Sequence, residues 1–428
     1  MSSYASSKKD KNTLNNLTPT RKRSARNRKK AAAPVSLSGN IQGTPPLLID
    51  AYSLQGRRPY QEDRVSMIID LVGSCPHAID SVRNLQTAYG QWSRMSLFCV
   101  CDGHAGARAA DYVIANLPGT FWSVVPEVLA SSRFGSDSDR GSGRGNGNGS
   151  DNDRRPTTHK TTPPPTGNDA LSQVEKQLNK MHVTHKPAST PIAATKQDTS
   201  ATNTSGGGTG KTTPTNTTFR SKKDTLICNL LKCTLATLDA HWLERVKNSR
   251  VNDGSCVLVA LLIDDRWFFA HLGDCRAIFV RGNTAKNITK DHTPGVDKKE
   301  TIRIQKAGGR LEKRPGGVHR VCAGGTKIAV TRAIGDANMK RLRTPDDTPV
   351  LSSNADTSVV SGETLKDDFT IVMVSDGVTS KLNNKKIAAC LRAANVENHS
   401  NLSQYLVERA YQNGSFDNIS ALIIRPQQ

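Results

Sequence analysis

Short apolar runs alternate with amphipathic stretches along most of the chain, and the two patterns predict a mixture of strands and helices. Strands are predicted at Val65–Leu71, Leu97–Cys101, Cys256–Ile263, Trp267–Leu272, Ala277–Val280, Phe369–Val374 and Ile419–Ile424. Helices are predicted at Ala105–Leu117, Leu226–Val246, Asp297–Ala307, Lys385–Ala394 and Leu402–Tyr411. Tight polar turns such as Asp264-Asp265 separate neighbouring strands, which favours antiparallel pairing. We therefore expect an α+β fold in which sheets pack on each other and helices lie outside them.

Two segments lack these patterns. Residues 1–43 are polar and basic, and residues 132–224 are rich in Gly, Ser, Thr, Asn and Pro. Neither segment has enough apolar side chains to offset the entropy cost of ordering it. We expect a disordered basic tail at 1–43 and one domain at 44–428, interrupted by a low-complexity, disordered insertion at 132–224.

The net charge of +21 is concentrated in these two segments. Residues 1–31 hold ten Lys and Arg against one Asp, and residues 132–224 hold fourteen against eight Asp and Glu. The basic charge therefore suggests weak, non-specific contacts with acidic partners. Specific nucleic-acid recognition is not expected, because the basic tract at 21–30 lacks interleaved aromatic residues.

The basic tract at 21–30 leaves three interpretations open: a solvated tail, a nuclear-import signal, or part of a mitochondrial transit peptide. The last is less favoured, because the tail has no apolar residues at helical spacing. The nine cysteines show neither a disulfide pattern nor zinc-ligand spacing, so we expect reduced, mostly buried thiols. No apolar run is long enough to cross a bilayer. We expect an intracellular protein, cytoplasmic or nuclear, that does not contact membranes.

Acidic residues recur at the ends of the predicted strands. They are Glu62 and Asp63, Asp102, Asp274, Asp376 and Asp417. Each alone is typical of a turn, but together at one sheet edge they would form a site of oxygen ligands suited to Mg²⁺ or Mn²⁺. Two such ions can activate a shared water molecule and hold a phosphoryl group. That chemistry also calls for an Arg to orient the phosphate and an acid, usually His, to protonate the leaving oxygen.

Eight short motifs, in order along the chain, resemble those of the metal-dependent serine/threonine protein phosphatases of type 2C. They are Arg58-Pro-Tyr-Gln-Glu62-Asp63, Asp102-Gly-His-Ala-Gly106, Gly254-Ser255, Gly273-Asp274-Cys275-Arg276, Asp291-His292, Thr331-Arg332-Ala-Ile-Gly335-Asp336, Ser375-Asp376-Gly377 and Asp417-Asn418. The resemblance covers residues 44–428 apart from the insertion. It implies a β-sandwich of two antiparallel sheets flanked by helices on both faces.

The resemblance also implies roles for individual residues. Asp102 would bridge two metal ions, with Gly103 offering its carbonyl oxygen to one of them. Asp376 and Asp417 would complete the first metal site, while Glu62 would support the second and Asp63 would stand behind the ligands. Arg58 would hold the phosphate, and His104 would be the general acid, although His104 could instead only orient Asp102. Asp291 and Asp336 are interpreted as structural acids, and His271 as a satisfied core residue.

The chain departs from the family pattern at two positions. Ser380 stands where the family often has a second Asp, so Asp274 lacks its usual partner and we expect a third metal ion to bind weakly or not at all. Cys256 replaces the Thr of the GST turn, which should mainly affect packing. The expected function is hydrolysis of phosphoserine and phosphothreonine in proteins by a monomer, and the alternative is a pseudophosphatase that acts as a binding module.

Overall fold

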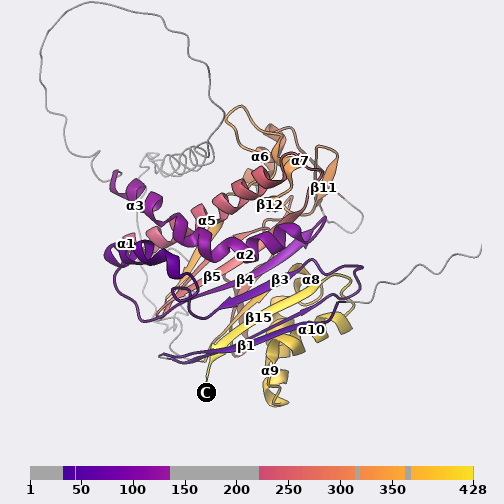
Figure 1. Ribbon diagram of the computed structural model, residues 1–428. Helices are drawn as coiled ribbons and strands as arrows, with labels where there is room; N and C mark the ends of the chain where they lie inside the picture. The colour runs from indigo at the N-terminus through magenta and orange to yellow at the C-terminus, as the bar shows by residue number, and fades with distance from the viewer. Residues whose placement is uncertain (1–31, 44, 135–220, 314–318, 362–367, 428) are drawn as a thin grey trace, which may run out of the picture.

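The computed structural model describes residues 32–43, 45–134, 221–313, 319–361 and 368–427. Within them, two antiparallel sheets lie face to face and a small third sheet lies at one side (Figure 1). The first sheet has the order β1 (Val35–Ile41), β2 (Leu47–Leu54), β15 (Ile419–Pro426), β14 (Thr370–Val374), β7 (Arg276–Arg281) and β8 (Thr284–Asn287). The second has the order β13 (Asp356–Val360), β6 (Arg266–Leu272), β5 (Gly254–Ile263), β4 (Met95–His104) and β3 (Arg64–Ile68), and β12 (Ile334–Gly335) also pairs with β5.

The long apolar strands are buried on both faces, which is why they read as continuous apolar runs rather than as alternating patterns. In β4, Phe98 and Val100 point into the core between the two sheets. Leu97, Cys99 and Cys101 belong instead to a second core under the helices. Because successive side chains of a strand point to opposite faces, one apolar run serves both cores.

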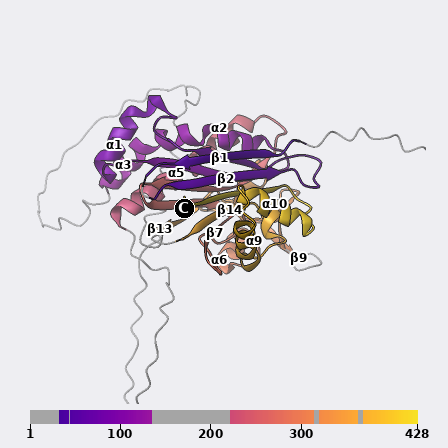
Figure 2. The ribbon, with the colours of Figure 1, turned by 90° about the horizontal axis from the view of Figure 1, so that it is seen from below.

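Helices cover the outer face of each sheet (Figure 2). Buried side chains on the outside of the β3–β6 sheet pack against α1 (Ile79–Tyr89), α2 (Arg108–Ser123), α3 (Val125–Phe134) and α5 (Lys222–Val246). The outside of the β2–β15–β14 sheet packs against α8 (Asp376–Thr379), α9 (Asn384–Val396) and α10 (Leu402–Gln412). The fold is therefore α+β, a β-sandwich of two antiparallel sheets with helices on both faces, as the sequence predicted.

The remaining elements form a side unit between β8 and β13. It contains α6 (Lys298–Lys306), β9 (Arg310–Lys313), β10 (His319–Ala323), β11 (Thr326–Ile328) and α7 (Ala337–Lys340), while a short 3-10 helix, η1 (Pro76–Ala78), precedes α1. The strands of the side unit pair in the order β11–β10–β9. Ile304 of α6 and Val321 of β10 are buried in the core between the main sheets, which attaches the unit to the sandwich.

The predicted strands and helices all occur, with shifted ends. Two boundaries need correction. The N-terminal tail was predicted to run to residue 43, but Val35–Ile41 forms β1 and pairs along its length with β2. The strand was missed because its side chains are mostly exposed and its apolar signal is weak. The insertion is also narrower than 132–224, since α3 extends to Phe134 and Ser221 caps α5 with a side chain that accepts from Asp224. Residues 1–31 and 135–220 lie outside the described residues.

All nine cysteines are free thiols, and seven of them are buried. Trp122, Trp242 and Trp267 are buried as packing residues, while Trp92 is partly buried. Within the described ranges no single helix has the length and apolar composition to cross a bilayer, and the bent pair Arg108–Ser123 and Val125–Ser132 reaches that composition only jointly.

Candidate metal and phosphate site

The predicted site residues lie at one end of the sandwich, where the ends of four strands meet. Asp102, Gly103 and His104 are the last residues of β4 and pair with Cys256, Ser255 and Gly254 of β5. They are therefore part of the sheet and not a turn that follows it. Antiparallel register with β5 fixes their positions, since each one is paired with a residue of that strand.

The opposite sheet contributes Asp376 and Asp417 to the same end. Asp376 begins α8 directly after β14, and Asp417 stands two residues before β15, the neighbour of β14. Close packing demands glycine beside them, since a Cβ on Gly377 would lie 1.9 Å from the Asn418 carbonyl oxygen. This close contact places the start of α8 against the turn before β15, so the segments that carry Asp376 and Asp417 lie together.

Five carboxylates interact strongly at this end. Burial raises the pKa of Asp102 well above its usual value, and the charge of Asp376 adds most to that effect. Further contributions come from Asp63, Asp274 and Asp417. Burial and the charge of Asp274 likewise raise the pKa of Asp376 well above its usual value. Carboxylates that oppose each other's ionisation require a cation or protons nearby.

Asp63 lies behind this group and is almost fully buried. Its Oδ2 accepts hydrogen bonds from the hydroxyl groups of Ser375, at 2.8 Å, and Ser420, at 2.7 Å. Burial nevertheless raises the pKa of Asp63 to about 7. Asp63 thus ties the residue before Asp376 to the start of β15, which agrees with a supporting position.

Arg58 forms an ion pair with the cluster. Its Nη2 donates to Oδ2 of Asp417 at 2.5 Å, and this hydrogen bond raises the pKa of the guanidinium. Asp376 and Asp102 contribute smaller attractive interactions. Because the Arg58 side chain is 51% exposed, it lies at the mouth of the site, where it can meet an anion that arrives from solvent.

Glu62 and Gly103 are held side by side. A Cβ on Gly103 would lie 2.5 Å from the Glu62 carbonyl oxygen, so the glycine permits this approach. The backbone N–H of Glu62 donates to Oδ1 of Asn418 at 2.8 Å. The charge of Glu62 also acts on the His104 ring and raises its pKa.

His104 makes its hydrogen bond to Asp336 and not to Asp102. The distance from Nε2 to Oδ2 of Asp336 is 2.8 Å, and Asp336 is almost fully buried. Burial by itself would lower the pKa of His104, but the charge of Asp336 and its hydrogen bond outweigh burial and raise the pKa. The interaction therefore favours an imidazole that holds a proton next to the carboxylate cluster.

Asp274 occupies the next strand end, where Cys256 contacts it. The Sγ of Cys256 lies 3.3 Å from Oδ1 of Asp274. Burial raises the pKa of Asp274, while the thiol opposes that shift. Cys256, which stands where the type 2C motif has Thr, therefore contacts a carboxylate of the site in addition to its role in packing. Ser380 donates to the Gly377 carbonyl oxygen at 3.3 Å.

The donor set fits hard divalent cations, because it consists of carboxylates with a backbone carbonyl. The carboxylates lie close enough for their charges to act on one another. In the described residues, no three His, Cys, Asp or Glu side chains stand in a finished ligating arrangement.

Two residues of the site were underestimated from the sequence. Asp336 was interpreted as structural, yet it is the partner of His104. Asn418 was noted only as part of a motif, yet it bonds three backbone groups of the 55–62 loop. The interpretation of Asp291 as a structural acid agrees with its ion pair to Arg276. His271 is buried, but its Nδ1 has no hydrogen-bond partner in the described part of the chain, so it is only half satisfied.

Comparison with known proteins supports the family resemblance. The family model described as protein phosphatase 2C matches residues 207–419, a range that begins after Arg58, Glu62, Asp63, Asp102 and His104. The chain is 32% identical over 173 residues to "Probable protein phosphatase 2C 74" of Oryza sativa subsp. japonica, which covers 40% of the chain and 39% of the relative. It is 30% identical over 187 residues to "Probable protein phosphatase 2C 59" of Arabidopsis thaliana, which covers 44% of the chain and 54% of the relative. The matched part thus spans about half the length of these curated relatives or less.

Solved structures extend the fold comparison to the N-terminal half. A serine-threonine phosphatase 2C from Toxoplasma gondii aligns over 92% of the chain and 100% of its own length, with a TM-score of 0.53 and 18% identity. A C. elegans sex determining protein aligns over 90% of the chain and 65% of its own length, with a TM-score of 0.53 and 19% identity. At such identities the likeness concerns the fold alone. The family model and the curated relatives show that the chain belongs to the protein phosphatase 2C family, and the solved structures show that it shares the fold.

Proposed function

We propose that this protein hydrolyses phosphoserine and phosphothreonine in proteins, with two Mg²⁺ or Mn²⁺ ions held around Asp102. The observation that carries the proposal is the cluster of partly buried carboxylates, drawn from both sheets, whose charges raise the pKa of Asp102 and Asp376. Such a cluster is unfavourable in a folded protein unless cations or protons offset its charge. Membership of a phosphatase family makes divalent ions the natural counter-charge.

The ligands would be the Asp102, Asp376 and Asp417 carboxylates and the Gly103 carbonyl oxygen, with Glu62 supporting the second ion. When bound, the two ions would supply a water molecule of lowered pKa and positive charge for the phosphoryl oxygens. Asp63 would hold the strands behind the ligands in register through Ser375 and Ser420. No side chain is then needed as the nucleophile.

Arg58 and His104 would act directly on the substrate. A phosphate offers the Arg58 guanidinium the same kind of oxygen acceptor that the Asp417 carboxylate offers in the structure. His104 would give its proton to the seryl or threonyl oxygen as the ester bond breaks. Asp336 would keep that proton on the ring and hold the ring in place through the 2.8 Å hydrogen bond.

A third metal ion would bind weakly or not at all. Asp274 is at the site, but Ser380 supplies a neutral hydroxyl where the family often has a carboxylate. That hydroxyl donates to the Gly377 carbonyl oxygen. A neutral oxygen attracts a divalent cation less than a carboxylate does.

The alternative function is a pseudophosphatase that binds phosphoproteins without hydrolysing them. Ser380 is the observation that favours it. The retained cluster and the His104–Asp336 pair weigh against it, because a binding module does not need a proton donor beside a carboxylate cluster.

The deciding experiment is phosphate release from a phosphothreonine peptide by purified full-length protein. Turnover should require Mn²⁺ or Mg²⁺, stop with chelator and be lost in Asp102→Asn. A folded wild-type protein without turnover in either metal would contradict hydrolysis and favour the pseudophosphatase.

Partners and location are further proposals. We propose a monomer whose substrates are phosphorylated proteins, located in the cytoplasm or nucleus. The basic tract at 21–30, on which the location rests, lies outside the described residues. Fusing residues 1–31 to a fluorescent protein tests it, since a nuclear signal should move the fusion into the nucleus.

A further inference from the structure

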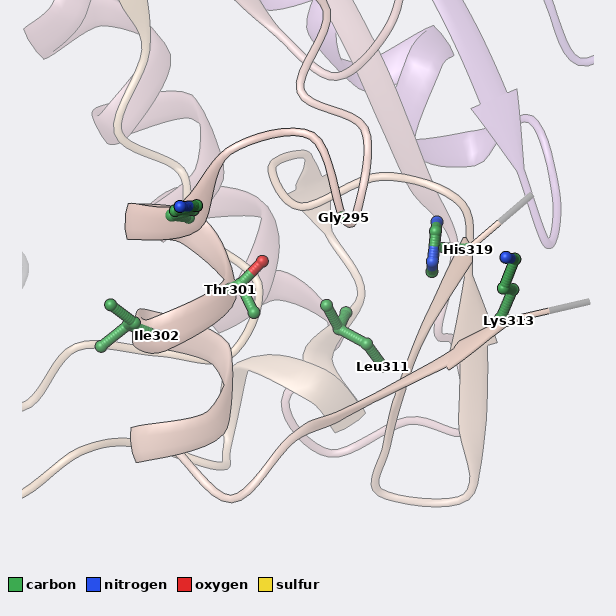
Figure 3. A pocket seen from close by; sticks show the side chains of 7 residues that line it. Gly295, Thr301, Ile302, Leu311, Lys313 and His319 are labelled. Carbon is green, nitrogen blue, oxygen red and sulfur yellow. The ribbon is translucent and has the colours of Figure 1, made fainter. Parts of the chain in front are cut away.

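A hollow of about 540 Å³ lies in the side unit, between α6 and the β9–β10 hairpin (Figure 3). Helix α6 supplies Lys298, Thr301 and Ile302 to one wall. The strands supply Leu311, Lys313 and His319 to the other, and Gly295 closes one end. Its volume lies in the range of sites that hold small ligands or a few side chains. We call it the α6–β10 groove.

Each wall of the groove carries one apolar side chain, Ile302 on α6 and Leu311 on β9. Helix α6 already buries Ile304 completely, whereas Ile302 is 51% exposed. Residues two apart on a helix point to nearly opposite sides, so Ile302 faces away from the core. Leu311 of β9 faces the groove while it packs partly against the core. Because an exposed isoleucine and a half-buried leucine both line the groove, it can receive an apolar side chain of a partner.

The rim of the groove is basic. Lys298 and Lys313 are exposed and have no ion pair or hydrogen bond within the described residues. Residues 295–328 contain nine Lys and Arg against three Asp and Glu. The three acids are used elsewhere: Asp297 caps α6, Glu300 binds Arg303 and Arg332, and Glu312 binds Lys327. The positive charge of the rim is therefore left for a partner.

Backbone geometry lets the loop at Gly295 pass close to His319. Gly295 has φ +82°, and a Cβ there would lie 2.7 Å from Nδ1 of His319. Only glycine allows the loop to pass this close to the ring without strain. The hydroxyl group of Thr301 lies on the wall opposite His319 (Figure 3).

The groove is also connected to the proposed catalytic end. The turn between β10 and β11 packs on α7, since a Cβ on Gly324 would lie 2.9 Å from the Asn338 carbonyl oxygen. Helix α7 starts directly after Asp336, the partner of His104. The side unit that forms the groove therefore contacts α7, the short helix that follows Asp336. A segment bound in the groove would lie on the same unit that contacts this helix.

We propose that the α6–β10 groove binds an acidic segment of a protein partner, with one large apolar side chain seated between Ile302 and Leu311. Charge decides the occupant: residues 1–31 and 132–224 of this chain are themselves net basic and do not complement the rim. Assigning that partner as a phosphoprotein substrate rests on the proposed function, whereas binding itself does not. The preferred substrate class is then phosphoproteins with acidic, apolar-anchored segments.

Binding is tested on full-length protein by fluorescence anisotropy with a labelled peptide of Asp and Glu around one central Leu. Lys298→Glu with Lys313→Glu should weaken binding by about tenfold or more, because both rim charges are reversed. The matched control is Arg83→Glu with Lys222→Glu, two exposed charges on α1 and α5, and it should bind as wild type does. Equal loss in both double variants would overturn the proposal.

The apolar anchor is tested separately. A peptide with Ser in place of the central Leu should bind about tenfold more weakly to wild type, and Ile302→Ser should remove most of that difference. Equal affinity of the two peptides for wild type would overturn the anchor. If a single-stranded oligonucleotide binds as tightly as the peptide and is lost in the same groove variant, the partner class is wrong.

Hydrolysis is measured in parallel on a small aryl phosphate, which is too small to reach both sites. The groove variants should leave that turnover unchanged while losing turnover on an acidic phosphopeptide. If the wild type does not hydrolyse the aryl phosphate, the proposed function is wrong, but the peptide-binding result can still be interpreted. Peptide affinity unchanged by the groove variants, with hydrolysis intact, would sink only the groove proposal.

Discussion

The side-chain oxygen of Asn418 accepts the backbone N–H of Glu62 at 2.8 Å, across 356 residues of sequence. The amide nitrogen of the same side chain donates to the carbonyl oxygens of Gln55, at 2.7 Å, and Tyr60, at 2.9 Å. Asn418 is almost fully buried. One side chain therefore holds the loop that carries Arg58 and Glu62 against the turn that carries Asp417.

Asn418→Ala should loosen this loop and destabilise the fold. Three hydrogen bonds of a buried side chain are lost, which predicts a cost of roughly 2–4 kcal/mol in the free energy of unfolding. Urea unfolding measures it. Asn413→Ala is the matched control, since its amide makes one exposed hydrogen bond to the Arg409 carbonyl oxygen. Equal stability of the two variants would show that the Asn418 contacts contribute nothing.

Replacement of His104 should discriminate between leaving groups. His104→Ala is expected to lower turnover of a phosphoserine peptide by about 100-fold or more, because the seryl oxygen needs a proton to leave. A nitrophenyl ester, whose leaving oxygen is stable as an anion, should be affected far less. Asp336→Asn should show the same pattern in weaker form. Equal losses on both substrates would count against the acid role.

Asp102→Asn should have opposite effects on stability and function. Because its pKa is raised in the folded state, the ionised Asp102 destabilises the metal-free fold at neutral pH, and this effect fades as pH falls. The variant should therefore melt at a higher temperature than wild type in chelator. Added Mg²⁺ or Mn²⁺ should stabilise wild type more than the variant. A lower melting temperature of the variant in chelator would contradict the repulsion argument.

Glu300 should make stability depend on acid pH. Burial alone would raise its pKa, but ion pairs with Arg303 and Arg332 hold the pKa at about 2. The folded pKa is below the unfolded value, so the contribution is complete above pH 4.5 and disappears as pH falls toward 2. Its full size is about 3 kcal/mol, and the Glu300 side chain is only 12% exposed.

Glu300→Gln tests this by urea unfolding at neutral and at acid pH. The variant should be destabilised at pH 7 and should approach wild type as the pH falls. Glu312→Gln, which removes an exposed partner of Lys327, should change stability little at either pH. A variant that loses equal stability at both pH values would show that the effect comes from packing and not from charge.

Ser380→Asp should strengthen a third metal site if Asp274 lacks only a partner there. Isothermal calorimetry of Mn²⁺ binding, carried out in the Asp102→Asn background, should detect a weak binding event in Ser380→Asp. This event should be absent when Ser380 is retained. An identical titration with Ser380 and with Asp at this position would remove the explanation.

The sequence by itself determined the fold class, because strands buried on two faces and amphipathic helices differ in apolar pattern over short distances. It also supplied the acidic residues at strand ends, as in Asp102 and Asp376, where the polar residue interrupts an apolar run. Strand β1 was not predicted, because an edge strand with exposed side chains has little apolar pattern. Its partners on β2 exist only once the sheet is assembled.

Only the tertiary structure decided which residues meet. His104 and Asp336 are 232 residues apart, and nothing local in either motif indicates their hydrogen bond. They are joined because β4 and β12 both pair with β5, where His104 and Gly335 lie opposite Gly254. The α6–β10 groove likewise arises from a helix and a hairpin whose core sides are fixed by packing, which leaves Ile302 and the rim lysines outside. Such juxtapositions depend on strand register and packing, whereas the residue types themselves are set by the sequence.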